Sequence, residues 1–318
     1  MKRTLKRGVA LLLTVVMMMA MMSVCAFGYT EVAVTGVSID KTLTVKDHDK
    51  APNATFTYSV KQGDSVVVEN AGSVTFADED VLTDGAVTKN AALNLSALKY
   101  SVPGVYRYSI VENATTEAGM TADSRVLTLD VFVADVDGEL VVTAVVSDGD
   151  KKANDFESTF DANKLTLKKV VAGNQGDKSK KFTFAVKINA GTGCAGDVIK
   201  VGSDYVTLNE SGVYEKASVQ LGHNETLEIV GLAASAAVTY EIVETAEDGY
   251  TTTIEGTATV EGQKATGDME TDASVTYTNT KAGTIPTGVI LTFAPYVLMV
   301  LGAAAIGFVF FRRRQHDC

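Results

Sequence analysis

Apolar and polar residues alternate with a period of two along much of the chain. The alternation is clear over residues 37–45, 106–110, 127–133 and 140–146. A period of two predicts half-buried β-strands, and Asp137-Gly138 between the last two runs is typical of a hairpin turn. Because many short strands are separated by turn residues, the sequence predicts an all-β fold built from β-sandwiches.

This pattern occurs twice along the chain. Residues 38–41 are echoed by residues 166–169, and residues 108–112 are echoed by residues 240–244. The lysine-to-glutamate spacing is 112 − 41 = 71 in the first copy and 244 − 169 = 75 in the second. We therefore expect two tandem β-sandwich domains, residues 29–161 and 162–281, joined by only a short linker near residues 161–164.

Residues 1–28 have the features of a secretory signal peptide. Four basic residues precede an apolar run over residues 9–22, and small residues follow at the positions expected for cleavage after Ala26 or Gly28. An uncleaved membrane anchor is the alternative, but the apolar run is shorter than the about 20 residues that a spanning helix needs.

A second hydrophobic segment lies near the C-terminus. Residues 289–311 carry no charge and are long enough for a transmembrane helix. Three arginines, residues 312–314, follow at once, and they predict that residues 312–318 form a cytoplasmic basic tail. The body between the two segments is therefore expected outside the cell.

Composition narrows the class of protein. Of the 318 residues, 46% are hydrophobic and 21% are charged, which is typical of a folded chain, and the formal net charge of −11 argues against nucleic acid as a partner. Only Cys194 remains if both ends are removed, so no internal disulfide is expected. We find no metal-ligand spacing and no catalytic constellation, and we predict neither a metal, a cofactor nor an enzyme.

Three polar residues fall on apolar strand faces. Lys169 follows Leu165 and Leu167 in the alternation, Glu244 follows Tyr240 and Ile242, and Asn279 follows Val275 and Tyr277. Isolated buried charges are costly, so these groups are either a Lys–Glu ion pair with an asparagine hydrogen bond or the parts of an intramolecular isopeptide bond. A dry core favours the uncharged amine, which can attack the asparagine carbonyl while a protonated glutamate assists. Alternation alone does not decide between the two.

The same segments resemble a known family. Residues 240–245 with Gly249-Tyr250 resemble the E-box of Gram-positive pilins and collagen-adhesin-type B domains. Residues 165–169 resemble the lysine strand of the streptococcal major pilin, and residues 277–280 resemble its asparagine strand. The resemblance implies immunoglobulin-like (CnaB-type) sandwiches and an isopeptide bond between Lys169 and Asn279, with Glu244 as catalyst.

Residues 284–288 resemble the sortase sorting signal in its pilin form, with Ile285, Pro286, Thr287 and Gly288 in the motif order. The resemblance implies that a sortase cleaves between Thr287 and Gly288 and passes the Thr287 carbonyl to an amine. The membrane helix would then be a transient anchor, and the mature chain would reside at the cell surface, in the wall or in a pilus.

The first domain departs from the family pattern. Lys41 and Glu112 match it, but Ser158 stands at the asparagine position, and a serine side chain has no carbonyl to attack. We expect a vestigial Lys41–Glu112 pair without an isopeptide bond. Asn154 has the right parity but lies one strand repeat too early, so only a register shift would bring it in.

A polymer also needs an amine that accepts Thr287. In the related major pilin this lysine precedes the last strand of the first domain, where this chain has Lys151 and Lys152; an ordinary solvated turn is the alternative. The resulting hypothesis is a pilus backbone subunit that is joined to copies of itself by a sortase and attached to peptidoglycan or a basal pilin. The rival hypothesis is a wall-anchored adhesin or accessory pilin that binds host surface ligands without polymerising.

Overall fold

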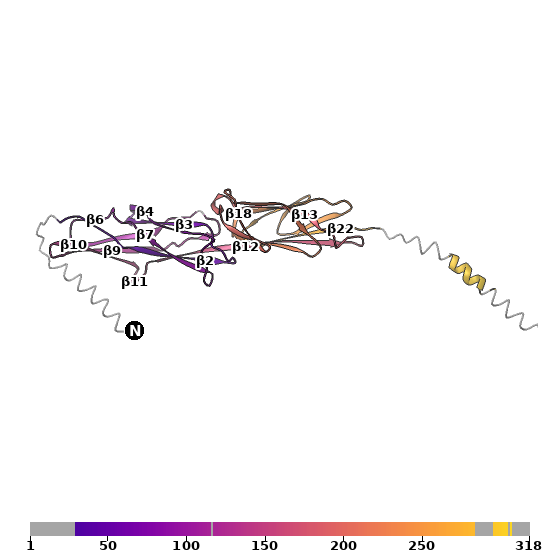
Figure 1. Ribbon diagram of the computed structural model, residues 1–318, viewed down its shortest axis with the longest axis horizontal. Coiled ribbons are helices and arrows are strands. Elements are labelled where there is room, and N and C mark those ends of the chain that lie inside the picture. Colours follow the sequence, from indigo (N-terminus) through magenta and orange to yellow (C-terminus); the bar gives the residue numbers. More distant parts are fainter. Residues whose placement is uncertain (1–28, 116, 284–294, 305, 307–318) are drawn as a thin grey trace, which may run out of the picture.

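The computed structural model describes residues 29–115, 117–283, 295–304 and 306, and the first two ranges form an elongated rod of β-strands (Figure 1). The all-β prediction is confirmed. The predicted signal peptide, sorting motif and basic tail lie outside the described residues, as does part of the predicted transmembrane helix. No helix in the described part of the chain has the length and hydropathy needed to cross a membrane.

One six-stranded sheet belongs to the first half of the rod. Its order is β11-β10-β9-β7-β3-β4. The strands are β3 (Ala54–Gln62), β4 (Ser65–Phe76), β7 (Gly104–Glu112), β9 (Val126–Val136), β10 (Glu139–Asp148) and β11 (Lys151–Lys152). The predicted hairpin joins β9 to β10, and its turn residues Asp137 and Gly138 have φ values of 54° and 90°. Aspartate and glycine tolerate these positive angles, which a two-residue hairpin turn requires.

A nine-stranded sheet runs through both halves because β12 (Asp155–Ala172) belongs to both. The first part of β12 pairs with β2 (Ser38–Lys46) and β8 (Met120–Thr121), and β5 (Ala86–Ala92) pairs with β2. Its second part lies between β17 (Thr226–Ala233) and β22 (Ala273–Thr280), and β19 (Thr251–Gly256) pairs with β22.

The prediction of a short linker is therefore wrong, since residues 161–164 lie inside one continuous strand. A bulge between Asn163 and Lys164 shifts the pleat by one residue. Buried side chains accordingly change from even positions, ending at Ala162, to odd positions, beginning at Leu165. The bulge lets one strand present an apolar face to each of two cores.

The second half completes its sandwich with a five-stranded sheet in the order β16-β13-β18-β21-β20. The strands are β13 (Phe182–Asn189), β16 (Val213–Leu221), β18 (Ser235–Glu244), β20 (Thr259–Glu261) and β21 (Lys264–Met269). The remaining elements are β1 (Val32–Ala33), β6 (Lys99–Tyr100), β14 (Val198–Val201), β15 (Asp204–Thr207) and the 3-10 turn η1 (Thr192–Cys194).

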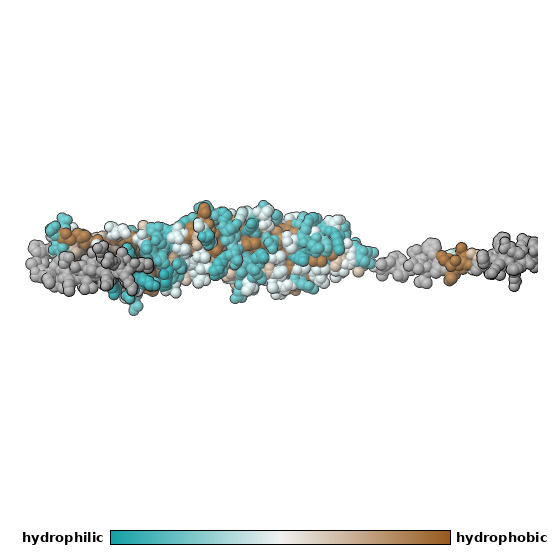
Figure 2. All heavy atoms as spheres, turned by 90° about the horizontal axis from the view of Figure 1, so that it is seen from below, coloured by the Kyte–Doolittle hydropathy of each residue, from teal (hydrophilic) through white to brown (hydrophobic). Residues whose placement is uncertain are grey.

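Each half has an aromatic-rich core, as the alternation requires. Tyr58 stacks on Phe156 in the first core with ring centroids 5.4 Å apart, and Phe184 meets Tyr277 edge-on at 5.2 Å in the second. Burial of such side chains contributes about 1.5–3 kcal/mol each. Hydrophilic side chains cover most of the rod, with more hydrophobic surface at its left end (Figure 2).

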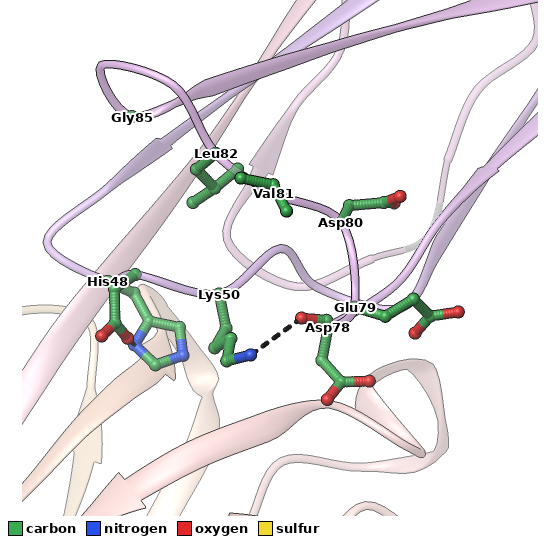
Figure 3. A pocket seen from close by; sticks show the side chains of 9 residues that line it. His48, Lys50, Asp78, Glu79, Asp80, Val81, Leu82 and Gly85 are labelled. Atoms are coloured by element: carbon green, nitrogen blue, oxygen red, sulfur yellow. Dashed lines mark hydrogen bonds and ion pairs between the residues drawn. The ribbon is translucent and has the colours of Figure 1, made fainter.

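Side chains between the halves add to the continuity of β12. His48 Nε2 lies 2.8 Å from the Val198 carbonyl oxygen, and the backbone N–H of Asn53 donates to Asp197 Oδ1 at 2.7 Å. Gly231 sits so close to the His48 ring that a Cβ there would be 2.6 Å from Cε1. Beside this contact is a shallow pocket where Lys50 donates to the Asp78 carbonyl (Figure 3).

Candidate functional site

Three strands bring the predicted polar residues together inside the second core. Lys169 lies on β12, Glu244 on β18 and Asn279 on β22, with exposed fractions of 0%, 1% and 0%. β12 and β22 are adjacent and parallel, with Val171 opposite Asn279. Asn279 is therefore diagonal to Lys169 on the same face, while Glu244 approaches from the facing sheet.

One carboxylate oxygen joins the three groups. Lys169 Nζ donates to Glu244 Oε1 at 2.7 Å, and Asn279 Nδ2 donates to the same oxygen at 3.1 Å. Thr252 on β19 donates to Glu244 Oε2 at 3.2 Å. The carbonyl oxygen of Asn279 is buried without a hydrogen-bond partner. An unpaired buried acceptor is costly, and this one belongs to the carbonyl that the proposed chemistry needs.

The surroundings of Lys169 favour an uncharged amine. Burial lowers the pKa of Lys169 below its usual value, although the Glu244 contact opposes the shift. The Phe182 ring centroid lies 4.2 Å from Lys169 Nζ and covers the nitrogen from the side. An amine that loses its proton in a dry site is a nucleophile, so the arrangement can form an amide bond with Asn279.

The first core holds a matching cluster with one replacement. Lys41 Nζ lies 2.6 Å from Glu112 Oε2 and 2.6 Å from Ser158 Oγ. Burial lowers the pKa of Lys41 and raises the pKa of Glu112. The Phe56 ring centroid lies 4.2 Å from Lys41 Nζ, as Phe182 does in the second half. The two clusters therefore differ chiefly in a hydroxyl where the other has an amide.

Strand register places Ser158 at the position equivalent to Asn279. Phe156 is opposite Lys41 as Tyr277 is opposite Lys169, so Ser158 and Asn279 stand two residues further on. Asn154 lies elsewhere: its side chain donates to the Ser38 carbonyl and to Asp40, each at 3.3 Å. The register shift that would have brought Asn154 to the lysine does not occur.

The candidate acceptor lysines lie outside both cores. Lys151 and Lys152 form the exposed strand β11, where they pair with Asp148 and Ser147 of β10. The residues of the sorting motif that would react with them fall outside the described residues.

Sequence reasoning missed the side chains that surround the two clusters. Phe56 and Phe182 cover the lysine nitrogens, and Thr252 binds the free oxygen of Glu244. The alternation of residues 182–188 contained the signal for Phe182, because it puts that ring on the inward face. Nothing in the local pattern singled out Thr252.

One group of metal-ligand type side chains occurs in the described part of the chain. Glu117, Cys194 and Asp197 bring their ligand atoms within 4.8 Å of one another between the two halves. Burial raises the pKa of Glu117 to about 8, of Asp197 to about 6 and of Cys194 to about 12. Burial thus favours the protonated forms of Glu117 and Cys194, and a cation bound here would have to displace their protons.

Comparison with known proteins shows which proteins this chain is similar to. Residues 37–161 match the Spy0128-like isopeptide containing domain, and residues 163–281 match a domain of unknown function, DUF7601. A curated protein from Streptococcus pyogenes serotype M1, named Pilin, is 27% identical over 331 residues, which covers 93% of this chain and 95% of that protein. This chain is a pilin-type protein.

Solved structures share the fold of this pilin-type chain. The major pilin from Streptococcus pyogenes aligns with a TM-score of 0.58 and 21% identity over 79% of this chain and 100% of that one. The T-13 major pilin of the same species gives 0.55 and 22% over 78% and 98%. The pilus tip adhesin Cpa from Streptococcus pyogenes is 30% identical over 145 residues, which covers 45% of this chain but only 20% of that protein.

The matched family of the first half is named for an isopeptide bond, yet Ser158 occupies the position where the second half has Asn279. The pilin-type chain thus carries an amide at this position only in its second half.

Proposed function

We propose that this chain is the structural backbone subunit of a sortase-assembled surface pilus, built from two immunoglobulin-like, CnaB-type domains. Residues 1–28 direct export, and residues 289–311 hold the chain in the membrane until it is sorted. The similarity to a pilin along 93% of the chain supports assembly into a polymer. The observation that carries the proposal is the buried Lys169–Glu244–Asn279 cluster, because a polymer under load needs its last strand held in place.

The proposed bond joins Lys169 Nζ to the side-chain carbonyl carbon of Asn279. The neutral amine attacks this carbon, and Glu244 in its protonated form donates to the Asn279 oxygen that otherwise has no partner. Glu244 then carries a proton from the lysine nitrogen to the departing NH₂. One C–N bond forms, one breaks and ammonia leaves, so the only chemistry that we propose for this chain is directed at itself.

The proposed link between subunits is also an amide. The cysteine thiolate of a sortase attacks the Thr287 carbonyl, the Thr287–Gly288 bond breaks, and Gly288 leaves as an amine. The Nζ of Lys151 or Lys152 of another copy then attacks the thioester and releases the thiol. Both lysines are exposed, which this step requires.

Peptide mapping tests the bond within the subunit. We expect a branched peptide that joins the Lys169 and Asn279 segments, with a loss of about one ammonia, roughly 17 Da, for a lysine–amide condensation. Separate linear peptides of unmodified mass would reject the bond, and a loss of two ammonias would show a further bond in the first half.

Blotting of muramidase-treated cells tests the backbone role. A ladder of SDS-resistant, high-mass species is expected from a polymer. A single band would favour the second candidate, an accessory pilin or adhesin that binds host ligands, which the partial similarity to a tip adhesin brings into consideration.

A further inference from the structure

Thr252 is the middle one of three successive threonines on β19, and it alone of the three turns toward the core. Thr251 and Thr253 are exposed, whereas Thr252 is half-buried and lies opposite Asn279 of β22. Threonine is common in strands, so the two exposed residues need no functional explanation. Thr252 differs from them because its hydroxyl reaches the buried carboxylate of Glu244.

The two oxygens of Glu244 have different partners. Oε1 accepts from Lys169 Nζ at 2.7 Å and from Asn279 Nδ2 at 3.1 Å. Among the described residues, Oε2 accepts only from the Thr252 hydroxyl, at 3.2 Å. The last torsion of a glutamate side chain is broad, so the carboxyl group turns easily unless both of its oxygens are held. The Thr252 hydroxyl thus keeps Oε1, and not Oε2, between the two reacting side chains.

We propose that Thr252 is a positioning residue for the Lys169–Asn279 bond, and that it makes one oxygen of Glu244 serve both steps of the proton transfer. This inference rests on the proposed function, because it concerns the same bond. Oε1 takes the proton that Lys169 Nζ gives up and passes it to Asn279 Nδ2, which leaves as ammonia. The bond from the Asn279 carbonyl carbon to Nδ2 breaks, the bond to Nζ forms, and Glu244 returns to its starting state.

The hydroxyl determines which oxygen carries the proton. Because Thr252 donates to Oε2, that oxygen acts as an acceptor, and a proton held by Glu244 stays on Oε1. Transfer between two partners of the same oxygen needs no rotation of the carboxyl group. Without the hydroxyl, the proton could reside on either oxygen, and a proton on Oε2 would face neither Lys169 nor Asn279.

The cluster of the first half has no hydroxyl of this kind. Glu112 contacts Lys41 through Oε2 and Ser158 through Oε1. Its further donor is a backbone N–H, that of Asp123. Of the two clusters, only the one that contains an amide therefore also has a threonine hydroxyl on its glutamate. A cluster that forms no bond has no proton to pass on, so this difference agrees with the proposed role of Thr252.

The rate of bond formation in newly made full-length chain tests this role. Cell-free synthesis in detergent is stopped at intervals, and the branched peptide, with its loss of roughly 17 Da, is measured by mass spectrometry. Thr252→Val keeps the shape of the side chain without the hydroxyl and should form the bond about tenfold or more slowly than the wild type. Thr252→Ser keeps the hydroxyl and should react at nearly the wild-type rate. The control Thr253→Val lies on the exposed face of the same strand and should match the wild type.

Resistance to a protease, measured in the same samples, separates the chemistry from folding. Thr252→Val should become resistant as fast as the wild type while its bond forms later. Equal rates of bond formation in these two chains would overturn the inference. A Thr252→Ser chain as slow as Thr252→Val would do the same, as would a Thr252→Val chain whose folding is delayed as much as its bond. A wild-type chain that never yields the branched peptide would instead overturn the proposed function.

Discussion

Replacing Asn279 by serine would give the second half the cluster that the first half already has. The substitution leaves Lys169 beside Glu244 and supplies a hydroxyl in the place of the amide, as Ser158 does beside Lys41. Because neither Lys169 nor Glu244 is left without a partner when the bond is absent, the change in stability comes mainly from the loss of the covalent bond. We expect Asn279→Ser to show no loss of ammonia in its mass and to unfold more easily than the wild type.

The magnitude follows from the chain that the bond closes. The loop contains 279 − 169 = 110 residues. A cross-link over such a loop removes chain entropy from the unfolded state that is worth about 5 kcal/mol at 25 °C. For a domain of this size that corresponds to a fall in Tm of roughly 15–20 °C.

Calorimetry and peptide mapping of wild type, Asn279→Ser and Glu244→Gln form the assay. Glu244→Gln keeps the shape of the side chain but cannot shuttle protons, so it should also lack the branched peptide. An Asn279→Ser protein whose Tm equals that of the wild type would refute the reasoning, as would a wild-type protein without a branched peptide.

Three further predictions concern the first half and the seam between the halves. Ser158→Asn restores an amide next to Lys41 and Glu112, so mapping should show a branched peptide joining residues 41 and 158, which is absent from Ser158→Ala. Lys151→Ala/Lys152→Ala should abolish the ladder on blots without lowering Tm, whereas the exposed Lys216→Ala should leave the ladder intact. Burial raises the pKa of Glu117 to about 8, so the folded state holds a proton that the unfolded state loses, and stability falls as pH rises from about 4.5 to 8. Glu117→Gln should therefore stabilise the chain by about 2–4 kcal/mol at pH 8 but hardly at pH 4, with the exposed Glu210→Gln as the control that should show no such pH dependence.

Strand alternation predicted the fold well because each sandwich buries one face of each strand. It placed Lys41, Lys169 and Asn279 on inward faces and Lys168 on the outward face, and the structure has them there. Alternation describes one strand at a time, however. It could not reveal that β12 continues through residues 161–164, because a bulge changes the phase of the pattern where a linker would also interrupt it.

Contacts between distant strands could not be predicted from the sequence. Thr252 reaches Glu244 only because β19 pairs with β22, and the cluster of Glu117, Cys194 and Asp197 forms where two halves meet. Neither the contact nor the cluster has a local spacing of residues from which it could be predicted. The prediction that the first half forms no isopeptide bond, by contrast, needs only Ser158, since it depends on the chemistry of that side chain and not on geometry.

The position of the proposed bonds explains why the first half can lack one. Tension in a polymer would enter at Thr287, pass through β22 to Asn279, cross to Lys169, and follow β12 back to Lys151. This path includes β12 but leaves residues 29–150 outside it. A cross-link between Lys41 and residue 158 would carry none of the load between neighbouring subunits.

Single-molecule stretching of polymers tests this load path. Wild-type subunits should show no unfolding step, because the bond excludes residues 170–278 from the path. Asn279→Ser subunits should lengthen by up to about 360–400 Å each, the extended length of 110 residues, less the folded span. Unfolding steps of the first half in wild-type polymers would show that the acceptor amine lies elsewhere than at Lys151 or Lys152, because only then would residues 29–150 bear the tension.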